Sequence, residues 1–198
     1  MAIAVAHRQS LVVAADAGEL RQHVEARGLR PNRVFAKLLR REYLGEGIRG
    51  RLVTSCEYDY SGSIISRQFE RLQELHSADP LNVVEPFFAV LDRERRCVGY
   101  VMEHVDGKAL VEYLFGNRFA EAREHLLAVR EIVRNLNSMD LAHGDINWGN
   151  VMITTHERQV LIDPEGMRTA TARDDSGNLS DMMRTLAARM ERFGINVA

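Results

Sequence analysis

The sequence predicts an α+β fold in two layers or lobes, because strand-like runs gather early in the chain and helix-like runs gather late. No internal repeat, low-complexity tract or long Pro/Gly/Ser-rich linker divides the 198 residues, so we expect one compact unit. The composition, 45% apolar and 27% charged, is that of an ordinary globular protein.

The first part of the chain predicts a helix, a strand, a loop and a second helix. A helix-leaning piece lies around Gly18 to Arg27. Residues 34–39 form a compact apolar run with Lys37 inside it, which suits a half-buried strand. The four glycines of residues 45–63 indicate a loop. The second helix is expected because its apolar residues recur at spacings of 4, 3 and 3: Ile65, Phe69, Leu72 and Leu75.

The remaining elements follow from the same patterns. Residues 82–90 and 97–102 predict two strands joined by the charged turn 92–96. A long amphipathic helix runs from Phe119 to Leu136, and two short β-prone runs follow at 151–154 and 160–162. After about a dozen polar residues (167–178), a last helix is expected from its apolar positions: Leu179, Met182, Met183, Leu186 and Met190.

The composition also disfavours several classes of function. The 26 basic and 28 acidic residues nearly balance, which argues against a protein built to bind nucleic acid. No apolar stretch approaches the ~20 residues needed to span a bilayer, and the first residues make a poor signal peptide. Cys56 and Cys97 lack CxxC spacing, so we expect neither a disulfide scaffold nor a zinc site. These features predict a soluble, cytoplasmic protein.

One stretch carries most of the chemical information. Residues 141–153 read LAHGDINWGNVMI, and residues 160–166 read VLIDPEG. Together they resemble the H-x-D-x-x-x-x-N catalytic loop of protein-kinase-like phosphotransferases and the D-x-G metal motif that follows it. One extra residue separates Asp163 from Gly166. Taken singly, such residues are common in loops and turns, but their order after a long amphipathic helix favours the phosphotransferase reading.

The resemblance implies a role for each residue, because phosphoryl transfer needs charge neutralisation and an oriented hydroxyl group. Asp163 would place a carboxylate on Mg²⁺, and Asn150 would add a neutral amide oxygen. Asp145 would accept a hydrogen bond from the acceptor hydroxyl and align it. His143 would hold the backbone of the loop.

Weaker resemblances lie earlier in the chain. Lys37 resembles the strand lysine that contacts nucleotide phosphates, although a lysine at a strand edge can also extend its ammonium group to solvent. Residues 98–107 resemble a kinase hinge, in which the backbone of Glu103 and Val105 would contact adenine beside Met102. The helical partner of Lys37 is predicted to be Glu70. The register of the helix leaves Gln68 as the alternative, and Glu70 then remains a surface residue.

Three departures separate the chain from protein kinases. No G-x-G-x-x-G loop precedes Lys37, Gly144 replaces the arginine of the HRD triplet, and Asn147 replaces the lysine two residues after the catalytic aspartate. These features look more like small-molecule and bacterial kinases: aminoglycoside phosphotransferases, RIO-like atypical kinases and lipopolysaccharide core kinases of the Kdo-kinase type. Residues 177–186 also resemble the helix that closes lipopolysaccharide kinases.

The resemblance therefore implies a minimal two-lobed protein-kinase-like fold, with a reduced β-rich N-lobe (about 1–101), a hinge (about 102–107) and a short helical C-lobe (about 108–198). The expected activity is ATP- and Mg²⁺-dependent transfer of the γ-phosphate to a hydroxyl group, foremost of a lipopolysaccharide core sugar or similar glycan. A small Ser/Thr protein kinase and a nucleotide-binding pseudokinase are the alternatives. We expect no nucleic-acid partner and no transmembrane segment, and peripheral membrane contact stays open.

Overall fold

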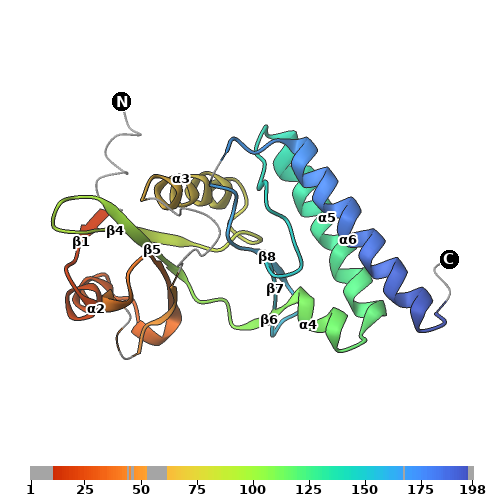
Figure 1. The fold of residues 1–198 in the computed structure, drawn as a ribbon, viewed down its shortest axis with the longest axis horizontal. Helices are drawn as coiled ribbons and strands as arrows, with labels where there is room; N and C mark the ends of the chain where they lie inside the picture. Colours follow the sequence, from red (N-terminus) through yellow and green to blue (C-terminus); the bar gives the residue numbers. More distant parts are fainter. Residues whose placement is uncertain (1–10, 44, 46, 53–61, 167, 196–198) are drawn as a thin grey trace. The chain divides into compact units, whose positions relative to one another are not determined.

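The computed structural model describes residues 11–43, 45, 47–52, 62–166 and 168–195 (Figure 1). The chain divides into two compact units. The first contains the residues up to Gln73 together with Glu85–His104, and the second contains Glu74–Val84 together with the residues from Val105 onward. The predicted α+β class is confirmed, and each unit has its own sheet.

A five-stranded mixed sheet forms the first unit. Its strands are β1 (Leu11–Val13), β2 (Val34–Leu38), β3 (Arg49–Leu52), β4 (Pro86–Leu91) and β5 (Cys97–Glu103). They lie in the order β1-β4-β5-β2-β3. Strand β5 pairs antiparallel with β4 and β2, whereas the outer strands β1 and β3 pair parallel with their neighbours. The strand that carries Lys37 is therefore interior to the sheet.

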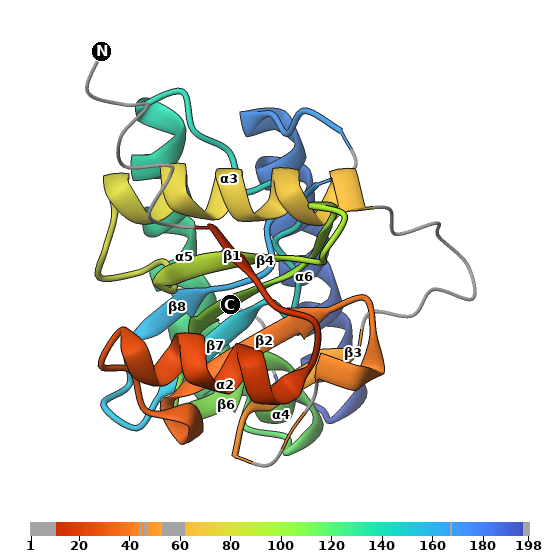
Figure 2. The same cartoon turned by 90° about the vertical axis from the view of Figure 1, so that its left-hand side faces the viewer.

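Helices cover both faces of this sheet, as Figure 2 shows. On one face, Leu20 and Val24 of α2 (Ala17–Ala26) belong to the same buried cluster as Ala36 and Leu38 of β2. On the other face lies α3 (Gly62–Ala78), whose Phe69 ring lies 5.9 Å from the ring of Tyr100 on β5. Short 3₁₀ turns at Pro31–Arg33 and Arg41–Tyr43 flank β2.

The second unit combines a small antiparallel sheet with helices. Its strands β6 (Gly107–Ala109), β7 (Val151–Thr154) and β8 (Gln159–Leu161) lie in that order. Its helices are α4 (Leu110–Phe115), α5 (Phe119–Ser138) and α6 (Ala172–Arg192). Helices α5 and α6 lie side by side in Figure 1, and their apolar faces are buried. The connection between α5 and β7 is the predicted catalytic loop.

Several sequence-based boundaries were wrong for identifiable reasons. The predicted strand 82–90 is split: Val83 bridges to Leu161 in the second unit, whereas β4 begins only at Pro86. Strand β3 was missed because its sequence, RGRL, has no apolar alternation. Strand β6 and helix α4 were missed because each is shorter than the periodicity windows that reveal such elements.

The predicted start of the last helix, after the polar residues 167–178, was also wrong, because helix α6 already begins at Ala172. Thr171 caps this helix: its hydroxyl accepts from the Asp174 N–H at 3.3 Å, and the Asp174 carboxylate accepts from the Thr171 N–H at 2.8 Å. The first turns of α6 are polar in sequence although they are helical. This earlier start brings Asp175 into the helix.

Candidate active site

The carboxylate of Asp145 lies in a loop whose neighbouring amides hold it in place. The side-chain NH₂ of Asn150 donates to Asp145 Oδ2 at 2.8 Å, and that of Asn147 donates to Oδ1 at 3.1 Å. Each carboxylate oxygen therefore has one amide donor, and the residue itself remains exposed. This arrangement leaves lone pairs on both oxygens for an incoming hydroxyl group.

Asn147 does more than replace a lysine. Its side-chain oxygen accepts from the N–H groups of Gly149 at 2.8 Å and Asn150 at 3.1 Å, while its NH₂ group donates to Asp145. The side chain thus ties the turn that carries Asn150 to the carboxylate of Asp145. Sequence analysis noted only that Asn147 stands where protein kinases have a lysine, and it missed this bracing role.

The surroundings of Asp145 disfavour its charged form. Desolvation raises the pKa of the Asp145 carboxyl group above its usual value, and the negative charges of Glu165 and Asp163 act in the same direction. Hydrogen bonds from Asn147 and Asn150 oppose this shift and lower the pKa. Glu165 is an acidic neighbour that the sequence analysis did not single out.

His143 lies inside the second unit rather than at its surface. Its ring Nε2 is 3.0 Å from the carbonyl oxygen of Ile162, and its own carbonyl accepts from the N–H of Glu165 at 2.9 Å. These bonds connect the catalytic loop to the segment that follows β8. The placement suits the predicted role of holding the loop backbone, and His143 is completely buried.

Asp175 is the main residue that sequence analysis missed. It is buried in the first turn of α6, and its two carboxylate oxygens accept from the backbone N–H groups of His143 at 2.9 Å and Gly144 at 2.6 Å. These are charge-assisted bonds in a buried setting, which makes them strong. Asp175 therefore fixes the backbone immediately before Asp145 from a helix about thirty residues further along the chain.

Gly144 is required by the geometry of the same turn. Its φ is +83°, in the left-handed region that favours glycine. A Cβ atom at this position would lie 2.7 Å from the Cβ of Glu165 and would overlap the Cβ of Ala170. The side chain of the arginine found here in protein kinases has no room in this loop.

We expect Gly144→Ala to lower the free energy of unfolding by at least about 2 kcal/mol, through backbone strain and overlap. Gly177→Ala in α6 is the matched control, because its Cβ would meet no atom within 4 Å. We expect the control to gain roughly 0.5–1 kcal/mol from helix propensity. Urea unfolding of the two variants measures both effects, and equal stabilities would contradict this account of the loop.

Asp163 and Asn150 come together where β8 ends. The Asn150 NH₂ group lies 3.4 Å from the carbonyl oxygen of Asp163, and the backbone carbonyl of Asn150 accepts from the N–H of Ile162 at 3.0 Å. Because its NH₂ group donates to Asp145 and Asp163, the amide oxygen of Asn150 is the atom left to accept or to ligate. Asp163 adopts a φ of +58°, a conformation uncommon for a residue other than glycine.

The side-chain types of Asp163 and Asn150 suit a magnesium ion bound together with a substrate better than a metal held by protein alone. Within the described residues, no group of three or more His, Cys, Asp or Glu side chains is arranged to hold a metal. Magnesium is usually bound by one or two carboxylates together with substrate phosphates and water. One carboxylate and one amide oxygen are therefore a sufficient protein contribution when ATP supplies the rest.

Lys37, in the first unit, is buried and faces helix α3. It lies opposite Tyr100 in the β2–β5 register, and side chains opposite each other in an antiparallel pair share a face. The Tyr100 ring contacts Phe69 of α3, so this face is the one that α3 covers. Lys37 is also one of only two lysines among the 26 basic residues, the other being Lys108. Burial of a lysine is costly without a polar or anionic partner.

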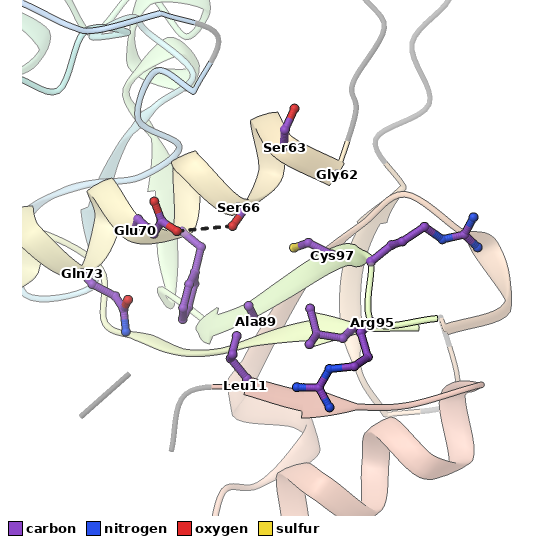
Figure 3. A pocket seen from close by; sticks show the side chains of 12 residues that line it. Leu11, Gly62, Ser63, Ser66, Glu70, Gln73, Ala89, Arg95 and Cys97 are labelled. Carbon is purple, nitrogen blue, oxygen red and sulfur yellow. Dashed lines mark hydrogen bonds between the residues drawn. The ribbon is translucent and has the colours of Figure 1, made fainter. Parts of the chain in front are cut away.

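The two candidate partners on α3 lie in different surroundings. Gln68 is buried, whereas Glu70 is exposed and accepts a hydrogen bond from the Ser66 hydroxyl at 3.4 Å (Figure 3). Glu70 also lines a cavity of about 830 Å³ together with Gln73, Cys97 and residues of β1 and β4. The burial of Gln68 favours the amide over the carboxylate as the neighbour of Lys37, and Glu70 in that role stays a prediction.

The predicted hinge residues lie at the end of β5 and directly after it. Met102 is buried, and the N–H of Glu103 donates to the carbonyl of Glu85 at 2.8 Å. Any contact of the Glu103 backbone with adenine would therefore use its carbonyl oxygen. The first unit ends at His104, and Val105 is the next residue and belongs to the second unit. The adenine contacts of these three residues remain predictions.

Comparison with known proteins identifies the family. No helix among the described residues is long and apolar enough to cross a bilayer. No curated protein matches the chain. The model of the lipopolysaccharide kinase (Kdo/WaaP) family matches residues 15–194, which includes every candidate residue described above. The chain belongs to the lipopolysaccharide kinase (Kdo/WaaP) family.

Proposed function

We propose that Asp145, Asn150 and Asp163 carry out Mg²⁺-dependent transfer of the γ-phosphate of ATP to a sugar hydroxyl. Membership of the lipopolysaccharide kinase family makes the chain a phosphotransferase that uses ATP and acts on a lipopolysaccharide core sugar. The observation that carries the residue assignment is the pair of hydrogen bonds by which the side-chain amides of Asn147 and Asn150 orient the Asp145 carboxylate. A protein that only binds nucleotide has no need to orient this carboxylate.

Each residue of the candidate site has a separate proposed role in phosphoryl transfer. Asp145 would accept a hydrogen bond from the acceptor hydroxyl and align it for attack. Asp163 and the amide oxygen of Asn150 would hold Mg²⁺, which neutralises charge on the phosphate oxygens. His143, Asn147 and Asp175 position these groups through the loop backbone and side chains.

Lys37 is proposed to neutralise nucleotide phosphate charge, and Met102, Glu103 and Val105 to contact adenine. A cytoplasmic location is proposed with this function, since ATP is the phosphate donor.

The function is tested by incubating the protein with labelled ATP and three acceptors: core lipopolysaccharide, a mixed cell-protein fraction, and none. We expect label in the lipopolysaccharide only. Label in the proteins would favour a Ser/Thr protein kinase. No label in either, with ATP still bound, would favour a pseudokinase.

The metal assignment predicts a specific defect. We expect Asp163→Ala to raise the Mg²⁺ concentration needed for half-maximal nucleotide binding by at least roughly tenfold, because a carboxylate leaves the metal shell. Calorimetric titration of ATP at a series of Mg²⁺ concentrations measures this shift. Asp181→Ala, an exposed carboxylate of α6, is the control. An unchanged Mg²⁺ dependence in Asp163→Ala would remove this residue from the metal site.

A further inference from the structure

A patch of exposed aromatic and basic side chains lies at one end of the second unit. Phe115 ends α4 and is 66% exposed, and Phe193, directly after α6, is 55% exposed. Ile195 is 42% exposed. We call these three residues, with Arg189 and Arg192, the aromatic–arginine patch. Large exposed aromatic side chains that lie together mark a surface that contacts a partner.

A contact between a ring and a guanidinium group links the ends of the two helices. The Arg189 guanidinium lies over the Phe115 ring, 4.8 Å from its centroid. The Phe193 ring lies 5.3 Å from that of Phe119, which is buried at the start of α5. Phe193 is thus anchored by an aromatic contact below while its outer surface faces water. The patch joins the ends of α4 and α6.

The charge on this flank of α6 is positive. Arg189, Arg192 and Phe193 are spaced by three and four residues, so they lie on the same side of the helix. Glu191 is the acidic residue of this last turn, and at two positions from Arg189 it lies roughly 200° around the helix axis. The flank therefore presents two guanidinium groups beside apolar rings.

We propose that the aromatic–arginine patch docks the protein on an anionic lipid bilayer. Phenylalanine rings enter the boundary between headgroups and acyl chains, while arginine side chains extend to bind headgroup phosphates. Each basic residue near such a surface adds to the attraction. The inference rests on the proposed function, because the acceptor is itself a lipid-linked glycan. Docking at this surface brings the enzyme to the plane in which that acceptor lies.

The test is sedimentation of the full chain with vesicles of phosphatidylglycerol and phosphatidylethanolamine, compared with vesicles of phosphatidylcholine alone. We expect binding to the anionic vesicles only, weakened by salt. The double variant Phe115→Ser/Phe193→Ser should lower the partition coefficient by roughly tenfold for each ring lost. Leu81→Ser is the matched control, because Leu81 is 65% exposed elsewhere in the same unit, and it should bind as the wild type does.

A second variant keeps the test decisive if the serine variant folds poorly. Arg189→Gln/Arg192→Gln changes only exposed and partly exposed groups, and should abolish the preference for anionic vesicles. Wild-type protein that fails to sediment overturns the proposal. So does a patch variant that binds vesicles normally but loses self-association, which would assign the patch to a second copy.

Phosphate transfer to water-soluble, delipidated core glycan is measured in parallel. If this transfer fails while vesicle binding depends on the patch, the proposed function is wrong and the docking surface stands. If transfer occurs and vesicle binding is absent, only the docking proposal falls.

Discussion

Replacing Asp145 by alanine will lower kcat for phosphate transfer by at least roughly a hundredfold, the effect expected when a group that orients or accepts the proton of a hydroxyl is removed. ATP affinity should stay near that of the wild type, because Asp145 is proposed to contact the acceptor rather than the nucleotide. Steady-state kinetics with a glycan acceptor measure kcat, and calorimetry measures ATP binding.

The stability of this variant gives an independent check. The pKa of Asp145 is raised in the folded protein, so the folded state binds this proton more tightly than the unfolded state does. Ionisation therefore costs folded-state stability as the pH rises through that raised pKa, and the cost is present at every pH above it. Asp145→Ala removes it, so the variant should be as stable as the wild type or more stable. Its loss of activity cannot then be attributed to unfolding.

The same shift predicts the pH dependence of the wild type. Activity requires the carboxylate, so kcat should fall on the acid side as the pH drops through the raised pKa, above the usual aspartate value of 3.8. Glu124→Ala, an exposed carboxylate on α5, is the control for both measurements. A control-like kcat in Asp145→Ala would remove Asp145 from the reaction.

The elements that sequence predicted well are those whose evidence is local. Short-range apolar patterns indicate the strand around Lys37 and the long helix α5, and both elements lie close to their predicted bounds. The order His143, Asp145, Asn150 is likewise contained in eight consecutive residues. The helix register also offered Gln68 as the alternative to the predicted Glu70, and Gln68 is the one of the two that is buried.

What sequence missed depends on contacts between distant residues or on the conformation of a loop. Asp175 looks like one of several acidic residues in a polar stretch, and only the packing of α6 brings it to the backbone of His143. Strand β3 is exposed at the sheet edge, so its sequence carries no alternating apolar pattern that would mark it. The bracing role of Asn147 depends on loop conformation, which composition does not encode.

Asp175→Asn will both destabilise the protein and lower its activity. The substitution preserves the shape of the side chain but keeps only one acceptor oxygen, so an NH₂ group faces the N–H of His143 or of Gly144. One buried backbone donor is then left without an acceptor, and a charge-assisted bond is lost. Together these effects should reduce the free energy of unfolding by about 2–4 kcal/mol. Urea unfolding measures this loss.

Comparison with a second aspartate of the same helix separates this effect from a general change in charge. Asp181→Asn alters an exposed carboxylate that pairs with Arg184, and it should change stability by no more than about 0.5 kcal/mol. If Asp175→Asn matches this control in stability and kcat, α6 does not position the loop.

The pattern of two defects identifies what each aspartate does. Asp145→Ala should lose kcat with stability retained, because the cost of the desolvated charge disappears and the amide donors of this exposed residue can turn to water. Asp175→Asn should lose both, because its bonds are buried and hold the backbone on which Asp145 is mounted. The two variants thereby distinguish Asp145, proposed to act on the acceptor, from Asp175, which holds the backbone of its loop from α6.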